Sequence, residues 1–168
     1  PWESVAESGQ TFLDEVELLA SDDEVQAFMC LTEDYRRDAF IDEFWKVRDP
    51  YPDTARNEFR EQWKERLAES RQMFDSVLDE RAKYYVLNGP PGIRLPICPP
   101  RSSTQIEAWF YGFEGIYEVF DAVTNGWLRP GQIAILFHRF SQNAQWRVWL
   151  PGDRLANIGE ASASSGLG

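Results

Sequence analysis

The feature that most constrains this chain is a change of sequence texture near residue 80. Residues 1–80 carry 22 acidic and 9 basic side chains, a net charge of −13, whereas residues 81–168 carry 6 acidic and 8 basic ones, a net charge of +2. The first part is rich in Glu, Arg, Ala and Leu at helical spacing, and the second in Gly, Pro, β-branched and aromatic residues. We therefore expect an α+β fold, in which an N-terminal helical half (residues 10–80) packs on a small, mainly antiparallel sheet of about four strands (residues 81–150).

The length of each half favours one domain over two. About 80 residues is close to the lower limit for an independent hydrophobic core, so we expect a single domain over residues 1–158. Residues 159–168 are small and polar, and this composition predicts a flexible linker or tail. Because the first residue is Pro1 and not Met, we expect it to follow either a removed secretory signal or the boundary of a fragment.

Capping residues and apolar spacing predict four helical stretches in the first half. Ser21 and Glu24 have the S-x-x-E spacing of a capping box, and Thr32 is placed to cap the following helix, which Pro50 ends. The predicted stretches cover residues 11–19, 21–31, 32–49 and 53–78. We expect the last of them to bury one stripe against the sheet, made of Phe59, Trp63, Leu67 and Phe74.

Strand signals dominate the second half. β-branched and aromatic runs predict strands over residues 83–88, 105–111, 132–138 and 145–150. Between the first two lie a rigid turn, Gly89-Pro90-Pro91-Gly92, and a proline-rich loop over residues 95–100. Periodicity favours a short helix over residues 116–123, with Ile116, Val119, Phe120 and Val123 aligned, and a strand is the alternative for this segment. Asn125-Gly126 can close it.

Composition excludes several classes of function. The net charge of −11 repels phosphate backbones, so we expect no nucleic-acid partner. No run of 18 apolar residues is present, so the sequence contains no transmembrane segment. Cys30 and Cys98 fit no common zinc or redox spacing, and we predict that they form no disulfide. With one histidine and no cofactor motif, the sequence predicts neither a metal nor a cofactor.

Candidate catalytic groups are few. His138 is the only imidazole, and a general base of this kind needs a nucleophile and an orienting acid beside it. Glu107 and Cys98 are the other reactive side chains that a small hydrolase-type enzyme would use. No nucleophile signature surrounds either group, so we assign no catalytic residue and keep the hydrolase as the alternative function.

The order of several short blocks resembles the bacterial GWxTD domain family over roughly residues 20–150. That family shows an F-W-x-x-R-D-P block, an N-E-F-R-E block and a G-P-P turn before a W-x-Y strand. The matching segments here are Phe44–Pro50, Asn57–Glu61, Gly89–Pro91 and Trp109–Tyr111. The naming motif is missing, since Ser76-Val77-Leu78-Asp79-Glu80 stands in its place, so the chain resembles a divergent member. The resemblance implies an exported, periplasmic or envelope-associated bacterial protein and carries over no catalytic residue.

A recognition surface is predicted around the Pro-Pro turn. A rigid turn loses little entropy on binding, and arginine and aromatic side chains are enriched at protein interfaces. The candidate partner-binding residues are Asn88, Gly89, Pro90, Pro91, Arg94, Trp109 and Tyr111. The simpler alternative is structural: Arg81, Lys83 and Arg94 then pair with carboxylates of the helical half.

Two hypotheses about function follow. The first is a non-catalytic protein-interaction or assembly module of an envelope-associated or multisubunit complex, whose partner is another protein chain. The second is the small enzyme that uses Glu107, His138 or Cys98. A cleft that gathers those three groups favours the enzyme, whereas a flat or chain-contacting aromatic patch favours the module.

Overall fold

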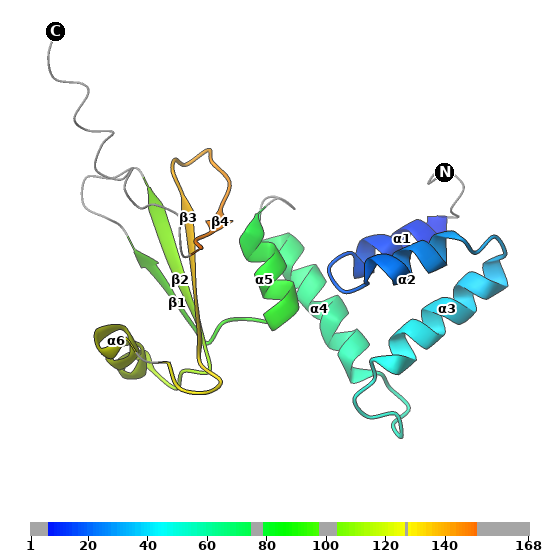
Figure 1. Ribbon diagram of the computed structural model, residues 1–168, viewed down its shortest axis with the longest axis horizontal. Helices are drawn as coiled ribbons and strands as arrows, with labels where there is room; N and C mark the ends of the chain where they lie inside the picture. Colours follow the sequence, from blue (N-terminus) through cyan, green and yellow to red (C-terminus); the bar gives the residue numbers. More distant parts are fainter. Residues whose placement is uncertain (1–6, 75–78, 98–103, 127, 151–168) are drawn as a thin grey trace, which may run out of the picture. The chain divides into compact units, whose positions relative to one another are not determined.

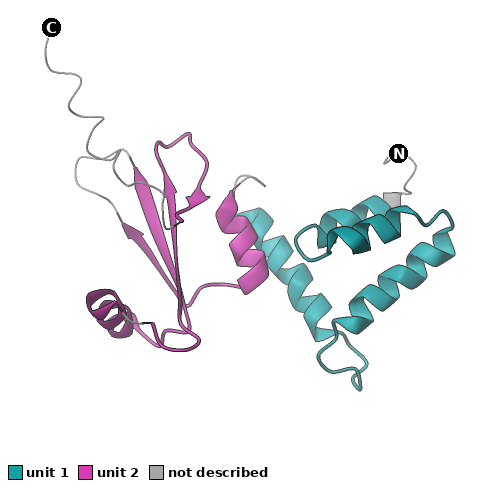
Figure 2. Ribbon diagram, viewed as in Figure 1, with its two compact units in different colours: residues 1–73 teal, residues 74–168 magenta. Residues whose placement is uncertain are grey.

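The computed structural model describes residues 7–74, 79–97, 104–126 and 128–150. The chain divides into two compact units, residues 1–73 and residues 74–168, coloured separately in Figure 2. Each unit is described below by itself. The single-domain expectation stays a prediction, and the division falls seven residues before the predicted change at residue 80. The predicted tail, residues 159–168, lies outside the described residues.

Six helices and four strands make up the described part of the chain (Figure 1). Unit 1 contains α1 (Glu7–Val16), α2 (Asp22–Met29), α3 (Asp34–Val47) and α4 (Glu58–Met73). Unit 2 contains α5 (Glu80–Asn88), β1 (Ile93–Ile97), β2 (Gln105–Tyr111), α6 (Ile116–Asn125), β3 (Ile133–Arg139) and β4 (Arg147–Val148). Helices fill the N-terminal half and an antiparallel sheet with strand order β1-β2-β3-β4 follows, so the predicted α+β fold is confirmed.

The first helices of unit 1 begin largely where capping chemistry places them. The hydroxyl of Ser21 accepts a hydrogen bond from the Glu24 amide, and the Glu24 carboxylate accepts one from the Ser21 amide, which completes the predicted capping box. The prediction that Thr32 caps the next helix is wrong. The N-cap of α3 is Glu33, one residue later, and its side chain makes no capping hydrogen bond.

The corner between α3 and α4 is built by Asn57. Its side-chain amide donates to the carbonyl oxygen of Trp45 at 2.6 Å, and its side-chain oxygen accepts from the Arg60 amide at 2.8 Å. This cap starts α4 at Glu58, so the prediction that the helix begins at residue 53 is wrong. Residues 51–54 form a turn instead, in which the Thr54 amide donates to the Tyr51 carbonyl.

Trp63 is buried, as its place in the α4 stripe predicts. Within unit 1, its indole Nε1 donates to the carbonyl oxygen of Glu15 at 2.8 Å and its ring stacks on Phe59. The α4 helix ends at Met73 and not at residue 78. Phe74, the last member of the predicted stripe, follows the helix and packs in the core of unit 2.

The predicted strand over residues 83–88 is wrong, because this segment is the helix α5. Asp79 caps it by accepting a hydrogen bond from the Arg81 amide. Its inward residues, Tyr85 and Val86, follow a helical spacing that the β-forming composition of the segment obscured. Gly89 ends the helix with a φ of 77°, a conformation that glycine adopts readily.

The missing strand lies in the predicted proline-rich loop. β1 forms over residues 93–97 and pairs antiparallel with β2, with Arg94 opposite Trp109 and Pro96 opposite Glu107. Because β1 is the edge of the sheet, the missing amide of Pro96 is tolerated there. The strands predicted over residues 105–111 and 132–138 are confirmed, whereas only Arg147 and Val148 of the predicted 145–150 strand form β4. β3 pairs with β2 so that Phe137 lies opposite Glu107.

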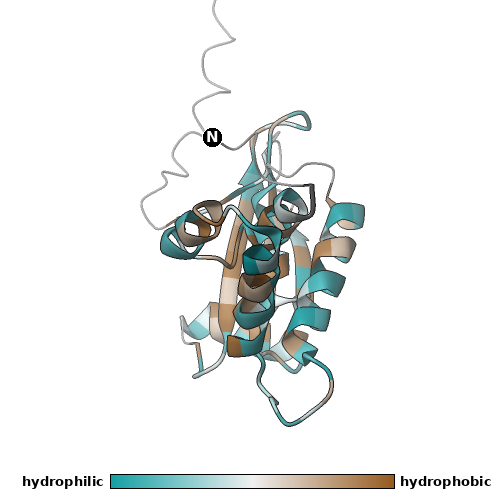
Figure 3. Cartoon of the chain, turned by 90° about the vertical axis from the view of Figure 1, so that its right-hand side faces the viewer, coloured by the Kyte–Doolittle hydropathy of each residue, from teal (hydrophilic) through white to brown (hydrophobic). Residues whose placement is uncertain are grey.

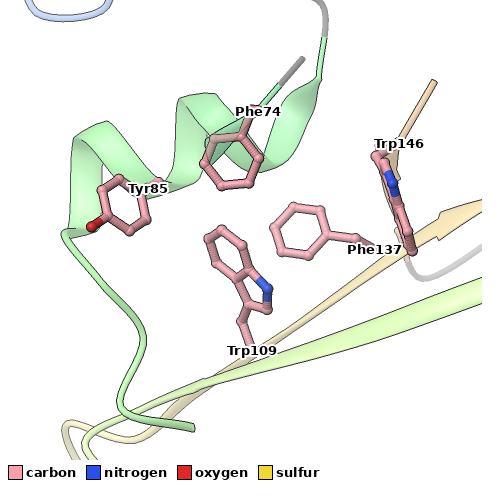
Figure 4. Packing of buried hydrophobic residues seen from close by; sticks show 5 residues of the cluster. All are labelled: Phe74, Tyr85, Trp109, Phe137 and Trp146. Carbon is pink, nitrogen blue, oxygen red and sulfur yellow. The ribbon is translucent and has the colours of Figure 1, made fainter. Parts of the chain in front are cut away.

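Each face of the sheet carries one helix in unit 2, with α5 and α6 on opposite sides (Figure 1). Beneath α5, the indole of Trp109 meets the ring of Phe137 at a centroid distance of 4.9 Å (Figure 4). This cluster is completed by Phe74, Tyr85 and Trp146. The second cluster joins α6 to the other face and contains Ala108, Phe110, Phe113, Val119 and Ala122. Hydrophobic colouring is concentrated on the strands, whereas the helices carry both colours (Figure 3).

Candidate functional site

The Pro-Pro turn predicted as a recognition surface connects α5 to β1. Asn88 and Pro90 are exposed, Pro91 is half-buried and Gly89 is buried. The Asn88 side chain donates to the carbonyl oxygen of Tyr84 at 3.0 Å, so it extends the end of the helix. The turn therefore presents two of its four predicted contact residues to solvent.

The two aromatic members of the predicted surface are held inside unit 2. Trp109 is 0 % exposed, and its ring lies in the cluster beneath α5. Tyr111 is half-buried, and its hydroxyl donates to the carbonyl oxygen of Gly89 at 3.2 Å. Both side chains therefore help to fix α5 and the turn on the sheet.

Glu107 is the centre of an ionic network on the same face. Its Oε1 accepts hydrogen bonds from the Trp109 indole at 2.6 Å and from the Arg94 guanidinium at 2.6 and 2.8 Å. Its Oε2 accepts from Arg81 Nη1 at 2.8 Å. Three side chains thus converge on one nearly buried carboxylate, and the side chain of Arg94 remains 41 % exposed.

Arg81 links this carboxylate to the start of α5. Its guanidinium donates to the buried carboxylate of Asp79 at 2.7 Å and lies 4.1 Å from the ring centroid of Trp146. The guanidinium of Arg81 therefore packs against an aromatic ring, which excludes water and so strengthens the ionic hydrogen bonds. The predicted pairing with carboxylates of the helical half is observed for Arg81 with Asp79, but it is wrong for Arg94, whose partner Glu107 lies on a strand of the β half. Arg81 also pairs with Glu107, and all of these residues belong to unit 2.

The electrostatics of the network keep Glu107 ionised. Burial raises the pKa of this carboxyl, but the hydrogen bonds from Trp109, Arg94 and Arg81 outweigh burial and hold the pKa below its ordinary value of 4.5. A carboxylate held in this way is a poor general base, since proton transfer to it breaks three favourable interactions. The arrangement is suited to holding α5 on the sheet.

The candidate catalytic groups are not brought together. Glu107 pairs with Phe137 and His138 pairs with Ile106, so Glu107 and His138 lie on opposite faces of the sheet. The imidazole of His138 contacts the ring of Phe140 edge-on at 5.0 Å. Cys98 lies outside the described residues. Among the residues that are described, no group of three or more His, Cys, Asp and Glu side chains could hold a metal ion.

The surface that the sequence prediction missed lies on α6. The prediction placed Ile116, Val119, Phe120 and Val123 on one stripe, but the helix buries Val119 and Ala122. Phe120 is 62 % exposed, Val123 69 % and Tyr117 87 %. The available signal was an apolar arc wider than one buried face, since six of the ten helix residues are apolar: Ile116, Tyr117, Val119, Phe120, Ala122 and Val123.

The polar side of α6 faces the segment that leads into β3. The carboxylate of Glu118 accepts hydrogen bonds from Arg129 at 3.3 Å and from Gln132 at 3.2 Å. Ile116, Phe120 and Val123 follow a spacing of four and three residues and so share a different side of the helix. We call these three residues and Tyr117 the α6 stripe.

Comparison with known proteins gives no match: no family model matches the chain, and no curated protein or solved structure does. None of the helices in the described ranges has both the length and the apolar character needed to cross a membrane. The geometry of unit 2 is therefore the main source for a functional proposal.

Proposed function

We propose that this chain is a non-catalytic protein-interaction module of an envelope-associated or multisubunit bacterial assembly. One observation carries the proposal: α6 is apolar on two sides, and only one of them is covered by the sheet. Exposed apolar side chains that gather on one element are typical of sites that bind another protein. Tyr117 and Phe120 together expose on the order of 250 Å², given that such side chains bury about 150–250 Å² each when enclosed.

The state of the ionisable groups supports an interaction module over an enzyme. Glu107, the one carboxylate among the predicted reactive groups, is neutralised by two arginines, and His138 lies on the other face of the sheet. A catalytic acid or base usually stands near a cleft with its proton free to move. Glu107 instead forms ion pairs that join α5 to the sheet.

The surface predicted from the sequence contributes a smaller second area. Asn88, Pro90 and Arg94 are its exposed members. Because Trp109 and Tyr111 are packed within unit 2, this area lacks the aromatic anchors that interfaces commonly use. The α6 stripe has such anchors, and we propose it as the main contact surface.

The proposed association with the bacterial envelope rests on the resemblance to GWxTD domains. Two of the matching blocks, around Trp45 and around Asn57, meet in the structure where the Asn57 side chain bonds to the Trp45 carbonyl. This contact supports a structural role for both blocks as the corner between α3 and α4. We propose that the blocks shared with GWxTD domains stabilise the fold and that the α6 stripe is the contact surface of this chain.

The test is purification of the native protein from its own cells with two matched variants. Phe120→Ser removes the centre of the α6 stripe, and Asn125→Ser changes an exposed polar residue on another side of the same helix. We expect Phe120→Ser to lose a co-purifying protein that Asn125→Ser retains, with both melting temperatures within about 2 °C of the parent, as surface substitutions usually are. A stable Phe120→Ser variant that keeps every partner contradicts the proposal.

A further inference from the structure

The α6 stripe also points to the chemistry of its partner. We propose that it binds an amphipathic helix of another protein, whose apolar stripe is flanked by lysine or arginine residues. This inference rests on the proposed function and adds to it the secondary structure and the charge of the partner segment. It is argued from the spacing of the exposed side chains and from the charges beside them.

The shape of the stripe favours a helix as the occupant. Ile116, Phe120 and Val123 form a ridge along one side of a ten-residue helix, and Tyr117 stands next to it. A ridge of this spacing fits the groove between side chains of a second helix, which is the common mode of helix packing. An extended peptide would need free strand edges, and the α6 stripe offers none.

The charges beside the stripe are acidic. Glu114 lies just before α6, and Asp121 lies four residues after Tyr117 and so borders the stripe on the Tyr117 side; both are exposed. The Asp121 carboxylate accepts a hydrogen bond from the Asn125 amide, which leaves its negative charge in place. Glu118 is neutralised by Arg129. A partner helix with basic flanks therefore gains attraction at its rim, whereas acidic flanks are repelled.

The same charges argue against a second copy as the occupant. In the antiparallel arrangement of two α6 helices about a two-fold axis, the same flank of each helix meets its counterpart. Asp121 would then lie near the Asp121 of the second copy, and this like-charge contact is destabilising.

The experiment compares two synthetic helical peptides that share one leucine stripe and differ only in their flanks, lysine in one and glutamate in the other. Binding to the full chain is measured by fluorescence anisotropy at low and physiological salt. We expect the lysine peptide to bind about tenfold tighter at low salt, as two rim charge pairs would produce. The double variant Glu114→Lys/Asp121→Lys should reverse the preference, and Phe120→Ser should weaken both peptides.

Each remaining outcome overturns a defined part of the account. Equal binding of the two peptides, both sensitive to Phe120→Ser, refutes the basic flanks and leaves the interaction module standing. A lysine peptide that does not bind, or that binds Phe120→Ser equally well, refutes the helical partner. A concentration-dependent dimer in sedimentation analysis that Phe120→Ser abolishes shows that a second copy occupies the stripe.

Discussion

Replacing Glu107 with Gln keeps the shape of the side chain and removes its charge from the network beneath α5. The amide of glutamine offers one accepting oxygen and one donating group, where the carboxylate offers two accepting oxygens. If the oxygen takes the position of Oε1, it still accepts from Trp109, whose indole has no access to water, and from Arg94. The amino group then faces Arg81 and the hydrogen bond from Nη1 is lost.

The expected loss follows from these contacts. A hydrogen bond to a charged group contributes about 1.5–3 kcal/mol, and breaking a buried ion pair by removing one partner costs about 3–5 kcal/mol. Arg81 keeps its contact with Asp79, which limits the damage. We therefore expect Glu107→Gln to lower the free energy of unfolding of unit 2 by about 2–3 kcal/mol.

The assay is urea unfolding of the full chain, followed through the NMR amide signals of β2. Glu114→Gln is the matched control, because Glu114 is exposed and its charge is removed in the same way. We expect the control to stay within about 0.5 kcal/mol of the parent. A Glu107→Gln variant as stable as the control would refute the view that the network holds α5 on the sheet.

The pH dependence of the same signals has a defined sign. The folded state holds the pKa of Glu107 below its ordinary value of 4.5, so the carboxylate contributes stability that is fully present above pH 4.5. That contribution is lost as the pH falls through the lowered pKa of the folded state. We expect unit 2 of the parent to lose stability below pH 4.5 more steeply than unit 2 of Glu107→Gln. Parallel pH profiles would contradict this assignment.

Three further predictions test other parts of the fold. Gly112→Ala should lower the free energy of unfolding of unit 2 by about 2 kcal/mol, because φ is +73° and an added Cβ would lie 2.3 Å from the Gly131 carbonyl oxygen. The control Gly115→Ala meets open space and should cost under about 1 kcal/mol in the same urea assay. Trp63→Ala should destabilise unit 1 by about 3–5 kcal/mol, since the side chain is 3 % exposed, and a loss below about 1 kcal/mol in its NMR signals would disprove that packing. Cys30 is exposed and we expect its thiol to be free, so the mass of the intact chain should be the same before and after reduction.

Local signals were sufficient to predict much of the fold. The capping box at Ser21, the strand at residues 105–111 and the glycine closure of α6 at Gly126 each depend on neighbouring residues alone, and each is observed. The missed helix α5 has a tertiary cause. Tyr84, Tyr85 and Val86 have strand propensity, and the tertiary contacts of α5 with the sheet override it.

Less of the candidate site could be predicted from the sequence. The network at Glu107 requires Arg94 and Arg81 to reach one carboxylate from separate elements, and only the pairing of β1 with β2 brings Arg94 beside it. Trp109 was predicted on a recognition surface and is buried instead, because the sequence does not show that α5 covers this face of its strand. Exposure on α6 likewise depends on how much of the helix the sheet covers.

The most direct test of the central claim places a photo-crosslinking amino acid at position 120 or at position 125 in the protein expressed in its own cells. Phe120 is the centre of the α6 stripe, and Asn125 lies on the same helix outside it. We predict that illumination joins position 120 to one discrete protein and leaves position 125 unlinked. Adducts of equal yield at both positions, or no adduct at position 120, would contradict the proposal that the α6 stripe binds another protein chain.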